Sequence, residues 1–392
     1  MKITKVTYKM ERPKGKRCKL DNSPKVLRID IELLPNEILM NIFSNLSIKE
    51  LLKCAQVSKK FRQISHDGSF WKCVNLYNQR VSCQFVAQLL HLGTEYLNLL
   101  GTTVLNDGDA VIPRKNNLKY LNLSVSSMED KFLVRLLRSC VSLEKLSLAG
   151  VEKMKGGSNR PLKRIRYDEE TAKLRTSWYV ECLLPNARML TTLDLSHVTG
   201  IIFCKLNSET MEEILLNCVE LKEANFWGQI IDAEFFANNL TPKIEKLNIS
   251  SNADFDGKQI VQLVKRCNNM TELDLAGCDV DVDFDNLEDG FEDFQNCLIA
   301  ISENLSQSLV KLRLPNHSIL CHEFLKSLPK LQNLWINNED REDVKNFDMK
   351  QYPHIALNEG TAKIAYSTYE YFEPRQGFWE IKCTTIDFSK PQ

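Results

Sequence analysis

A short apolar pattern, LxxLxL, recurs along most of the chain and constrains its fold more than any other feature. An apolar residue occupies the fourth and sixth positions of each copy and the first position of every copy except the first, which begins with Thr94. The fourth position falls at Leu97, Leu121, Leu146, Leu193, Ala224, Leu247, Leu273, Leu312 and Leu334. Successive copies are separated by 24, 25, 47, 31, 23, 26, 39 and 22 residues. Such self-similarity indicates one structural unit stacked many times.

The spacing matches that of leucine-rich repeats, whose period is roughly 20–29 residues. The spacings of 47, 31 and 39 residues are then one repeat plus an insertion. Side chains alternate along a strand, so the apolar residues should point inward and the residues between them outward. The sequence therefore predicts a parallel sheet along the concave face of a curved solenoid.

The residues between the apolar positions are expected to line the open face of this sheet. The central row consists of Asn98, Asn122, Ser147, Asp194, Asn225, Asn248, Asp274, Arg313 and Trp335. The central row and the row just before it, to which Lys311 belongs, become basic and aromatic toward the last repeats. Together with Trp227, which follows its strand, this makes Lys311, Arg313, Trp335 and Trp227 candidates for substrate binding. For the two tryptophans, packing into the neighbouring repeat is the alternative interpretation.

Helical stretches with good N-terminal caps are expected between the strands. DKFLVRLLRSC follows Ser127, ETMEEILLNC follows Ser208, and GKQIVQLVKRC follows Asp256. Each stretch ends in a cysteine, and these are Cys140, Cys218 and Cys267. A cysteine at a repeated position predicts core packing rather than a reactive thiol. With no CxxC pair among the 13 cysteines, we interpret all of them as reduced thiols.

A different pattern precedes the repeats. In LLPNEILMNIFSNLS the apolar residues fall at helical spacing, and Pro35 suits the first turn of that helix. SIKE, at residues 47–50, predicts a capping box, and the helix that follows should break near Val57 and Ser58. About 45 residues in short helices bury little surface alone, so the surplus apolar side chains predict a protein partner.

The segment LLPNEILMNIFSNLSIKELLKCAQVSKKFRQISHDGSFWKCVNL strongly resembles an F-box. With the repeats behind it, the chain resembles F-box/leucine-rich-repeat proteins, the substrate receptors of cullin-based (SCF) ubiquitin ligases. The resemblance implies an α/β chain with a three-helix F-box, a repeat solenoid and a C-terminal tail packed on it. It also implies binding to the Skp adaptor and, through it, to the cullin and RING subunits. The adaptor-binding residues implied are Leu34, Pro35, Ile38, Leu39, Ile42, Phe43, Leu51, Leu52, Val57, Phe61 and Trp71.

Three C-terminal segments narrow the resemblance. PHIALN (353–358), TAKIA (361–365) and FWEIKC (378–383) resemble the closing segment of the S-phase kinase-associated members of the family. That likeness implies a phosphorylated cell-cycle substrate such as a cyclin-dependent-kinase inhibitor. It also implies a Cks-type accessory protein that reads the phosphorylated residue.

Charge is balanced overall but not locally. The 51 basic and 51 acidic residues cancel, which argues against a dedicated nucleic-acid binder. Residues 1–28 carry ten basic and two acidic residues, residues 153–175 carry eight and three, and residues 279–293 carry eight acidic residues. Each basic segment is either a nuclear-import or partner signal or a solvated segment. The acidic insertion is expected to be a solvated loop, although Asp281, Asp283, Asp285 and Glu292 mimic calcium-loop spacing.

The predicted layout has four parts. These are a disordered basic segment at 1–28, the F-box at 29–76, the repeats at 77–340 and the tail at 341–392. We expect no membrane span, no metal and no cofactor, because no phosphate loop, zinc motif or nucleophile elbow occurs. The function expected is that of a non-catalytic receptor subunit in the nucleus and cytoplasm. The alternative is an F-box/repeat scaffold with a non-degradative nuclear or RNA-associated role.

Overall fold

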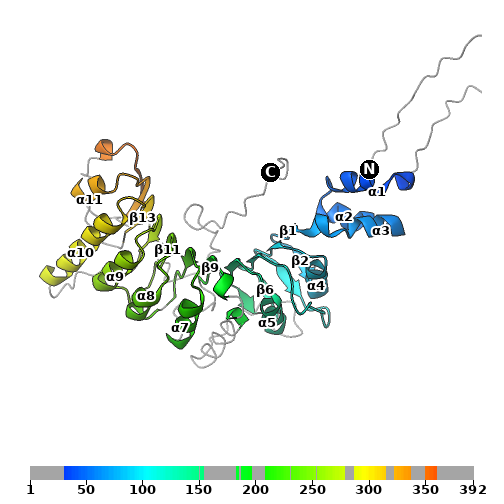
Figure 1. The fold of residues 1–392 in the computed structure, drawn as a ribbon, viewed down its shortest axis with the longest axis horizontal. Helices are drawn as coiled ribbons and strands as arrows, with labels where there is room; N and C mark the ends of the chain where they lie inside the picture. The colour runs from blue at the N-terminus through cyan, green and yellow to red at the C-terminus, as the bar shows by residue number, and fades with distance from the viewer. Residues whose placement is uncertain are drawn as a thin grey trace, which may run out of the picture. The chain divides into compact units, whose positions relative to one another are not determined.

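The computed structural model describes residues 31–149, 151–153, 182–184, 187–196, 208–229, 231–252, 254–278, 287–314, 322–336 and 349–359. Two compact units divide the chain between Phe70 and Trp71, and each is treated by itself (Figure 1). The predicted basic segment 1–28, nearly all of the basic insertion and the end of the tail lie outside the described residues.

The first unit is helical. Its elements are η1 (Ile31–Leu33), α1 (Asn36–Phe43), α2 (Ile48–Cys54), α3 (Lys59–Ser65) and η2 (Gly68–Trp71), the last of which crosses into the second unit. The predicted capping box is confirmed, since Ser47 Oγ accepts from the Glu50 amide and the Glu50 carboxylate accepts from the Ser47 amide. The predicted break is confirmed as well, because Ser58 caps a separate helix.

A small core holds these helices together. Phe43 and Phe61 meet edge to face, with ring centroids 5.2 Å apart. Leu39, Leu51 and Ile64 complete the core, and all five side chains are at most 6% exposed. We call residues 31–70 the helical module below.

The second unit contains an eleven-stranded parallel sheet in the order β1-β3-β5-β7-β9-β10-β11-β12-β13-β14-β15. Its strands are β1 (Cys73–Asn75), β3 (Tyr96–Asn98), β5 (Tyr120–Asn122), β7 (Lys145–Ser147), β9 (Thr192–Asp194), β10 (Glu223–Asn225), β11 (Lys246–Asn248), β12 (Glu272–Asp274), β13 (Lys311–Arg313), β14 (Asn333–Ile336) and β15 (Ala356–Glu359). A second, four-stranded sheet is formed by β2 (Arg80–Ser82), β4 (Thr103–Leu105), β6 (Ser127–Met128) and β8 (Glu152–Lys153).

The predicted parallel pairing is confirmed at every copy of the pattern. Equivalent residues stand opposite each other, as in the pairing of Leu97 with Leu121. The 47-residue spacing does not interrupt the sheet, because Leu146 of β7 pairs directly with Leu193 of β9. The sheet therefore stays in register across this spacing.

Two strands of the large sheet were not predicted. β1 belongs to the sequence WKCVNL, in which Trp71 and Val74 replace the usual leucines. β15 pairs in parallel with β14, although among its residues only Leu357 matches the pattern. Described residues that follow the last predicted repeat, at 349–359, thus extend the sheet by one strand.

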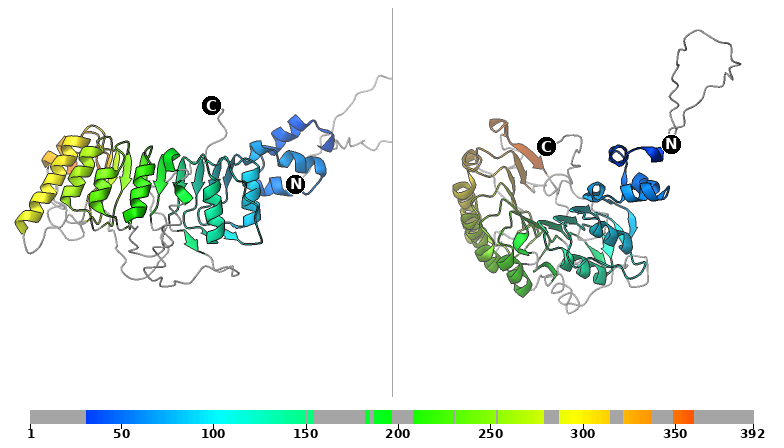
Figure 2. Two further views of the ribbon diagram at one scale, coloured as in Figure 1. Left: turned by 60° about the horizontal axis from the view of Figure 1, so that its bottom comes forward. Right: turned by 45° about the vertical axis from the view of Figure 1, so that its right-hand side comes forward.

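Helices follow most strands and lie on one side of the large sheet (Figure 2). They are α4 (Cys83–His91), α5 (Asp130–Ser139), α7 (Ser208–Asn217), α8 (Ala233–Asn239), α9 (Gly257–Arg266), α10 (Leu287–Leu305) and α11 (His322–Ser327), with short η3 (Ala187–Met189) and η4 (Met349–Gln351). One expected cap is wrong. Glu129, not Ser127, precedes α5, because Ser127 is taken up by strand β6.

The described part of the acidic insertion is helical rather than a loop. Its last residues, from Leu287 onward, belong to α10, a 19-residue helix that continues to Leu305. Glu292 lies within this helix, while Asp281, Asp283 and Asp285, the other residues of the calcium-like spacing, lie outside the described part of the chain. A solvated loop was expected here, but Phe294, Cys297 and Leu298 bury one face of the helix.

The three repeated cysteines pack in the core as predicted. Cys140, Cys218 and Cys267 are at most 2% exposed and form no disulfide. Burial raises the pKa of Cys140 to about 11, and the pKa values of Cys218 and Cys267 to about 12. A thiolate is strongly disfavoured at these positions, so the thiols are inert at neutral pH.

The central row that was expected to be exposed is buried instead. From Asn98 to Asp274 its polar side chains are at most 9% exposed. The reason is a repeated hydrogen bond: Asn122 Oδ1 accepts from the Ser124 amide at 2.9 Å, and Asn248 Oδ1 accepts from the Ser250 amide at 2.9 Å. These side chains turn back onto the bend after each strand, where they satisfy backbone N–H groups that would otherwise be buried unpaired.

Asp194 is the position in this row where replacement should raise stability. Burial raises the pKa of its carboxyl, although Ser196 Oγ and amide and Ser147 Oγ donate to it. Asparagine can accept the same bonds from Ser196, as Asn248 does from Ser250, without a buried charge. Asp194→Asn should therefore stabilise the protein at pH 7, because the folded state no longer buries a charged carboxylate.

The sign follows from the raised pKa. The folded state favours the protonated acid, so the wild type loses stability as pH rises above the ordinary aspartate pKa of about 3.9. The difference in Tm between variant and wild type should be largest at pH 7 and shrink toward pH 4, as measured by calorimetry. Asp109→Asn, at an exposed aspartate, is the control. A gain that does not change with pH would contradict the assignment.

Candidate functional site

The helical module leaves several large apolar side chains in solvent. Leu33 is 81% exposed, Val57 66%, Ile38 47% and Ile31 37%. Pro35, between η1 and α1, is exposed as well. A module of about 40 residues with so much uncovered apolar surface favours protein binding, because soluble domains seldom expose such groups together.

Hydrogen bonds to backbone carbonyl groups tie together the segments that carry some of these side chains. Lys60 Nζ donates to the carbonyl oxygens of Glu32 and Leu34, both at 2.8 Å, and so ties the segment before α1 to α3. Arg62 Nε donates to the Ala55 carbonyl at 3.1 Å across the turn between α2 and α3. The binding surface is therefore pre-formed, which lowers the entropy lost when a partner binds.

The residues implied as adaptor-binding separate into two groups. Pro35, Ile38 and Val57 are exposed, and Leu34, Ile42 and Leu52 are half-buried. The interior positions are Leu39, Phe43, Leu51, Phe61 and Trp71, each at most 6% exposed. Only the first group can contact a partner directly, whereas the second shapes the surface from beneath. Adaptor binding itself stays a prediction for both groups.

Trp71 has a role that the sequence pattern did not reveal. It stands at the first position of the repeat WKCVNL, and its ring lies edge to face with Phe85 of α4 at 6.5 Å. It is 2% exposed and belongs to the second unit. Allowing an aromatic residue at the first position of the pattern would have found it.

A second candidate surface is the row of side chains at the third position of each LxxLxL copy, which precedes the central row. Its charged members pair across neighbouring strands: Lys246 lies 2.9 Å from Glu223, and Glu272 lies 3.1 Å from Lys311. A weaker contact of 3.9 Å joins Lys246 to Glu272. These half-exposed groups neutralise one another along four strands, so this stretch offers little net field to a charged partner.

The four residues predicted to bind substrate are partly engaged within the chain. Lys311 pairs with Glu272, and Arg313 approaches Asp274 at 3.8 Å. Trp227 is half-buried, and its Nε1 donates to Ser251 Oγ at 3.2 Å. Trp335 is half-buried within β14. Substrate binding by these residues stays a prediction, and for the two cations it would require an exchange of carboxylate partners.

Sequence reasoning did not single out the stacked tyrosines of the first repeats. Tyr96 and Tyr120 occupy equivalent positions of β3 and β5, and their rings stack at 6.5 Å. Tyr96 is 38% exposed. The repeated triplet YLN at 96–98 and 120–122 is the signal that could have located this pair.

No cluster of three or more His, Cys, Asp or Glu side chains with metal-binding geometry occurs among the described residues. Within the same part of the chain, no helix has the length and apolar character needed to cross a bilayer.

Comparison with known proteins shows that the sequence of the helical module matches a known family. Residues 31–77 match the family model F-box-like. The chain is 48% identical over 44 residues to "F-box protein At5g52880" of Arabidopsis thaliana, which covers 11% of this chain and 16% of that protein. It is 48% identical over 48 residues to "Ubiquitin ligase complex F-box protein UFO1" of Saccharomyces cerevisiae, covering 12% and 7%.

A third relative is named for both an F-box and leucine-rich repeats. The chain is 49% identical over 39 residues to "F-box/LRR-repeat protein 5" of Mus musculus, which covers 10% of this chain and 6% of that protein. The chain thus matches at most about a sixth of the length of these relatives. It carries an F-box-like domain, and the similarity rests on that short N-terminal stretch.

Proposed function

We propose that the chain is the substrate-receptor subunit of an SCF-type ubiquitin ligase. The observation that carries this proposal is the group of exposed apolar side chains on the module that matches the F-box-like model, with Leu33 at 81% and Val57 at 66% exposure. In this function the module binds the Skp adaptor, which buries these exposed apolar side chains. The adaptor in turn connects the chain to the cullin and RING subunits.

The second unit has the properties needed to hold a substrate. Its strands pair in register from β1 to β15, which supports a curved leucine-rich-repeat solenoid and gives a long, rigid sheet. A receptor of this kind forms no covalent intermediate. It accelerates ubiquitin transfer by proximity, because a bound substrate is held at high effective concentration beside the loaded enzyme.

The finer assignment extends the resemblance of the C-terminal segments. We propose a phosphorylated cell-cycle substrate such as a cyclin-dependent-kinase inhibitor, read with a Cks-type accessory protein, in the nucleus and cytoplasm. The supporting sequence is PHIALN, whose residues from Ala356 belong to β15; TAKIA and FWEIKC lie outside the described residues. The internal pairing of Lys311 and Arg313 favours an accessory protein as the phosphate reader.

Co-expression with the Skp adaptor tests the receptor function. The two proteins should co-purify, and a reconstituted ligase should ubiquitinate proteins captured from cells whose proteasome is inhibited. Absence of an adaptor complex would refute the receptor function. Adaptor binding without ubiquitination of any captured protein would instead support the scaffold, and steeply salt-dependent RNA binding by residues 1–28 would add to that outcome.

A further inference from the structure

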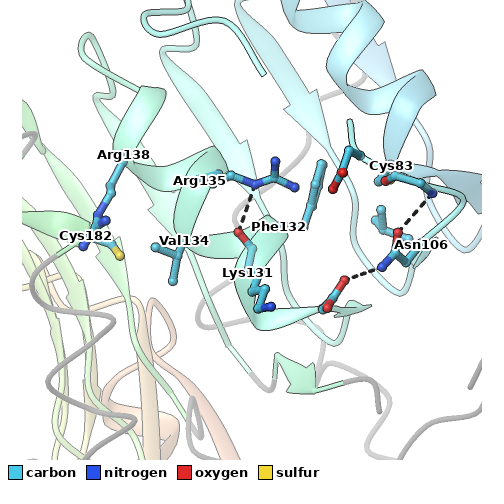
Figure 3. Close-up of a pocket in the computed structure, with 12 residues that line it drawn as sticks. Cys83, Asn106, Lys131, Phe132, Val134, Arg135, Arg138 and Cys182 are labelled. Atoms are coloured by element: carbon cyan, nitrogen blue, oxygen red, sulfur yellow. Dashed lines mark hydrogen bonds between the residues drawn. The ribbon is translucent and has the colours of Figure 1, made fainter. Parts of the chain in front are cut away.

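A cavity of about 750 Å³ opens on the helix side of the second unit (Figure 3). It lies between α5 and the loop that follows β4. Among its lining residues that the structure describes, none belongs to the helical module or to the open face of the large sheet. Its volume falls within the roughly 300–1,000 Å³ typical of ligand sites.

The base of the cavity is apolar. Cys83, Val104 and Phe132 are 2–3% exposed, and Cys182 is 1% exposed. Such a base can cover an apolar side chain from a ligand, at a gain of about 25 cal/mol for each Å² removed from water.

One wall of the cavity is cationic. Lys131, Arg135 and Arg138 line it from α5, and their spacing of four and three residues places them on one face of the helix. All three are exposed. Arg135 is held by a bond from Nη1 to the Ala110 carbonyl at 3.3 Å. Figure 3 shows Arg138 toward the Cys182 side of the space and Arg135 near its middle.

The opposite wall bears acceptors and is fixed in shape. Asn106 Nδ2 donates to a carboxylate oxygen of Glu129 at 2.5 Å, and Asn106 Oδ1 accepts from the Gly108 amide at 3.1 Å. Gly108 has φ 134°, a conformation that glycine adopts readily. Asp109 adds a second carboxylate to the lining.

We propose that this cavity binds an extended peptide carrying an anionic side chain next to an apolar one. The guanidinium and ammonium groups of α5 suit a phosphate or carboxylate. Backbone N–H groups of the peptide would donate to Asp109 and Glu129, and the apolar side chain would pack on Phe132. A free inorganic anion lacks these backbone donors and the apolar side chain, so the arrangement favours a peptide.

This site is independent of adaptor binding, and the test uses the purified full-length chain alone. Three oriented peptide libraries share random flanks and carry phosphoserine, glutamate or serine at a fixed central position. An immobilised chain should enrich sequences from the phosphoserine or glutamate library over the serine library, with an apolar residue preferred next to the centre. Whichever of the two is enriched identifies the source of the negative charge.

A matched pair of variants locates the binding. Lys131→Gln with Arg138→Gln should weaken binding of the enriched peptide at least about tenfold by fluorescence anisotropy, as expected for loss of charged hydrogen bonds. Lys258→Gln with Lys265→Gln, at the same spacing on exposed positions of α9, should leave it unchanged. Arg135→Gln is a third variant, which also removes the contact to Ala110.

Three results would overturn the proposal. The first is equal recovery from all three libraries. The second is peptide binding that the α5 variants do not alter although their Tm is that of the wild type. The third is displacement by inorganic phosphate at the concentration at which the peptide itself competes, since that would indicate a simple anion site.

Discussion

Glutamate at Ile38 and Val57 together should lower affinity for the Skp adaptor at least about a hundredfold without unfolding the helical module. Each wild-type side chain is large, apolar and exposed, at 47% and 66%. Burying one such side chain at an interface contributes about 1.5–3 kcal/mol, and a charge in its place adds a desolvation penalty. Two of them therefore account for two or more decades in Kd.

Isothermal titration with the purified adaptor measures this effect, and circular dichroism checks that the module stays helical. Val111→Glu is the matched control, because Val111 is 75% exposed and lies outside the module. Replacing Leu39 is a poor test, since Leu39 is 0% exposed and its truncation would act through stability. Unchanged affinity in the double variant would contradict adaptor binding by these side chains.

The largest loss of stability in the second unit is expected for Phe236→Ala. Phe236 of α8 stands between Phe226 and Phe255, edge to face with both at 5.4 and 5.6 Å, and all three are 0% exposed. The ring thus connects the cores of two consecutive repeats, since Phe226 and Phe236 belong to the repeat of β10 and Phe255 to that of β11. Its removal should cost about 3–5 kcal/mol, through lost burial plus the cavity left behind.

Urea denaturation followed by tryptophan fluorescence measures this loss. Hydrogen exchange should show weakened protection centred on β10, β11 and β12, because each repeat is stabilised mainly by its neighbours. Tyr77→Ala, at a side chain that is 57% exposed, should change stability by less than about 0.5 kcal/mol. A loss below about 1 kcal/mol for Phe236→Ala would show that the repeats do not share this core.

The helical module shows which structural features the local sequence can predict. The capping box at Ser47 and the break before Ser58 were predicted, because both depend on residues within one turn of each other. The division of the eleven implied adaptor residues into six accessible and five interior ones was not. Leu39 and Ile38 are adjacent and equally apolar, and only the packing of α1 on α3 distinguishes them.

The acidic insertion and strand β15 are two segments whose structure the repeat pattern did not predict. The acidic insertion was expected to be a loop, yet from Leu287 it forms α10, because Phe294, Cys297 and Leu298 find a buried face. β15 was missed because only Leu357 of its residues fits the repeat, while the edge of β14 supplies backbone partners to a strand of almost any sequence.

The spacing of LxxLxL by itself determined which residues stack on which, since a period of two along each strand and a common repeat length leave one register. It also determined the inward leucines and the buried cysteines. Only the tertiary structure decided the fate of the polar row from Asn98 to Asp274, which is buried rather than exposed. The physical reason is that its hydrogen-bond partners are N–H groups in the bends and side chains in neighbouring repeats, such as Ser147 beside Asp194, and these come together only when the repeats stack.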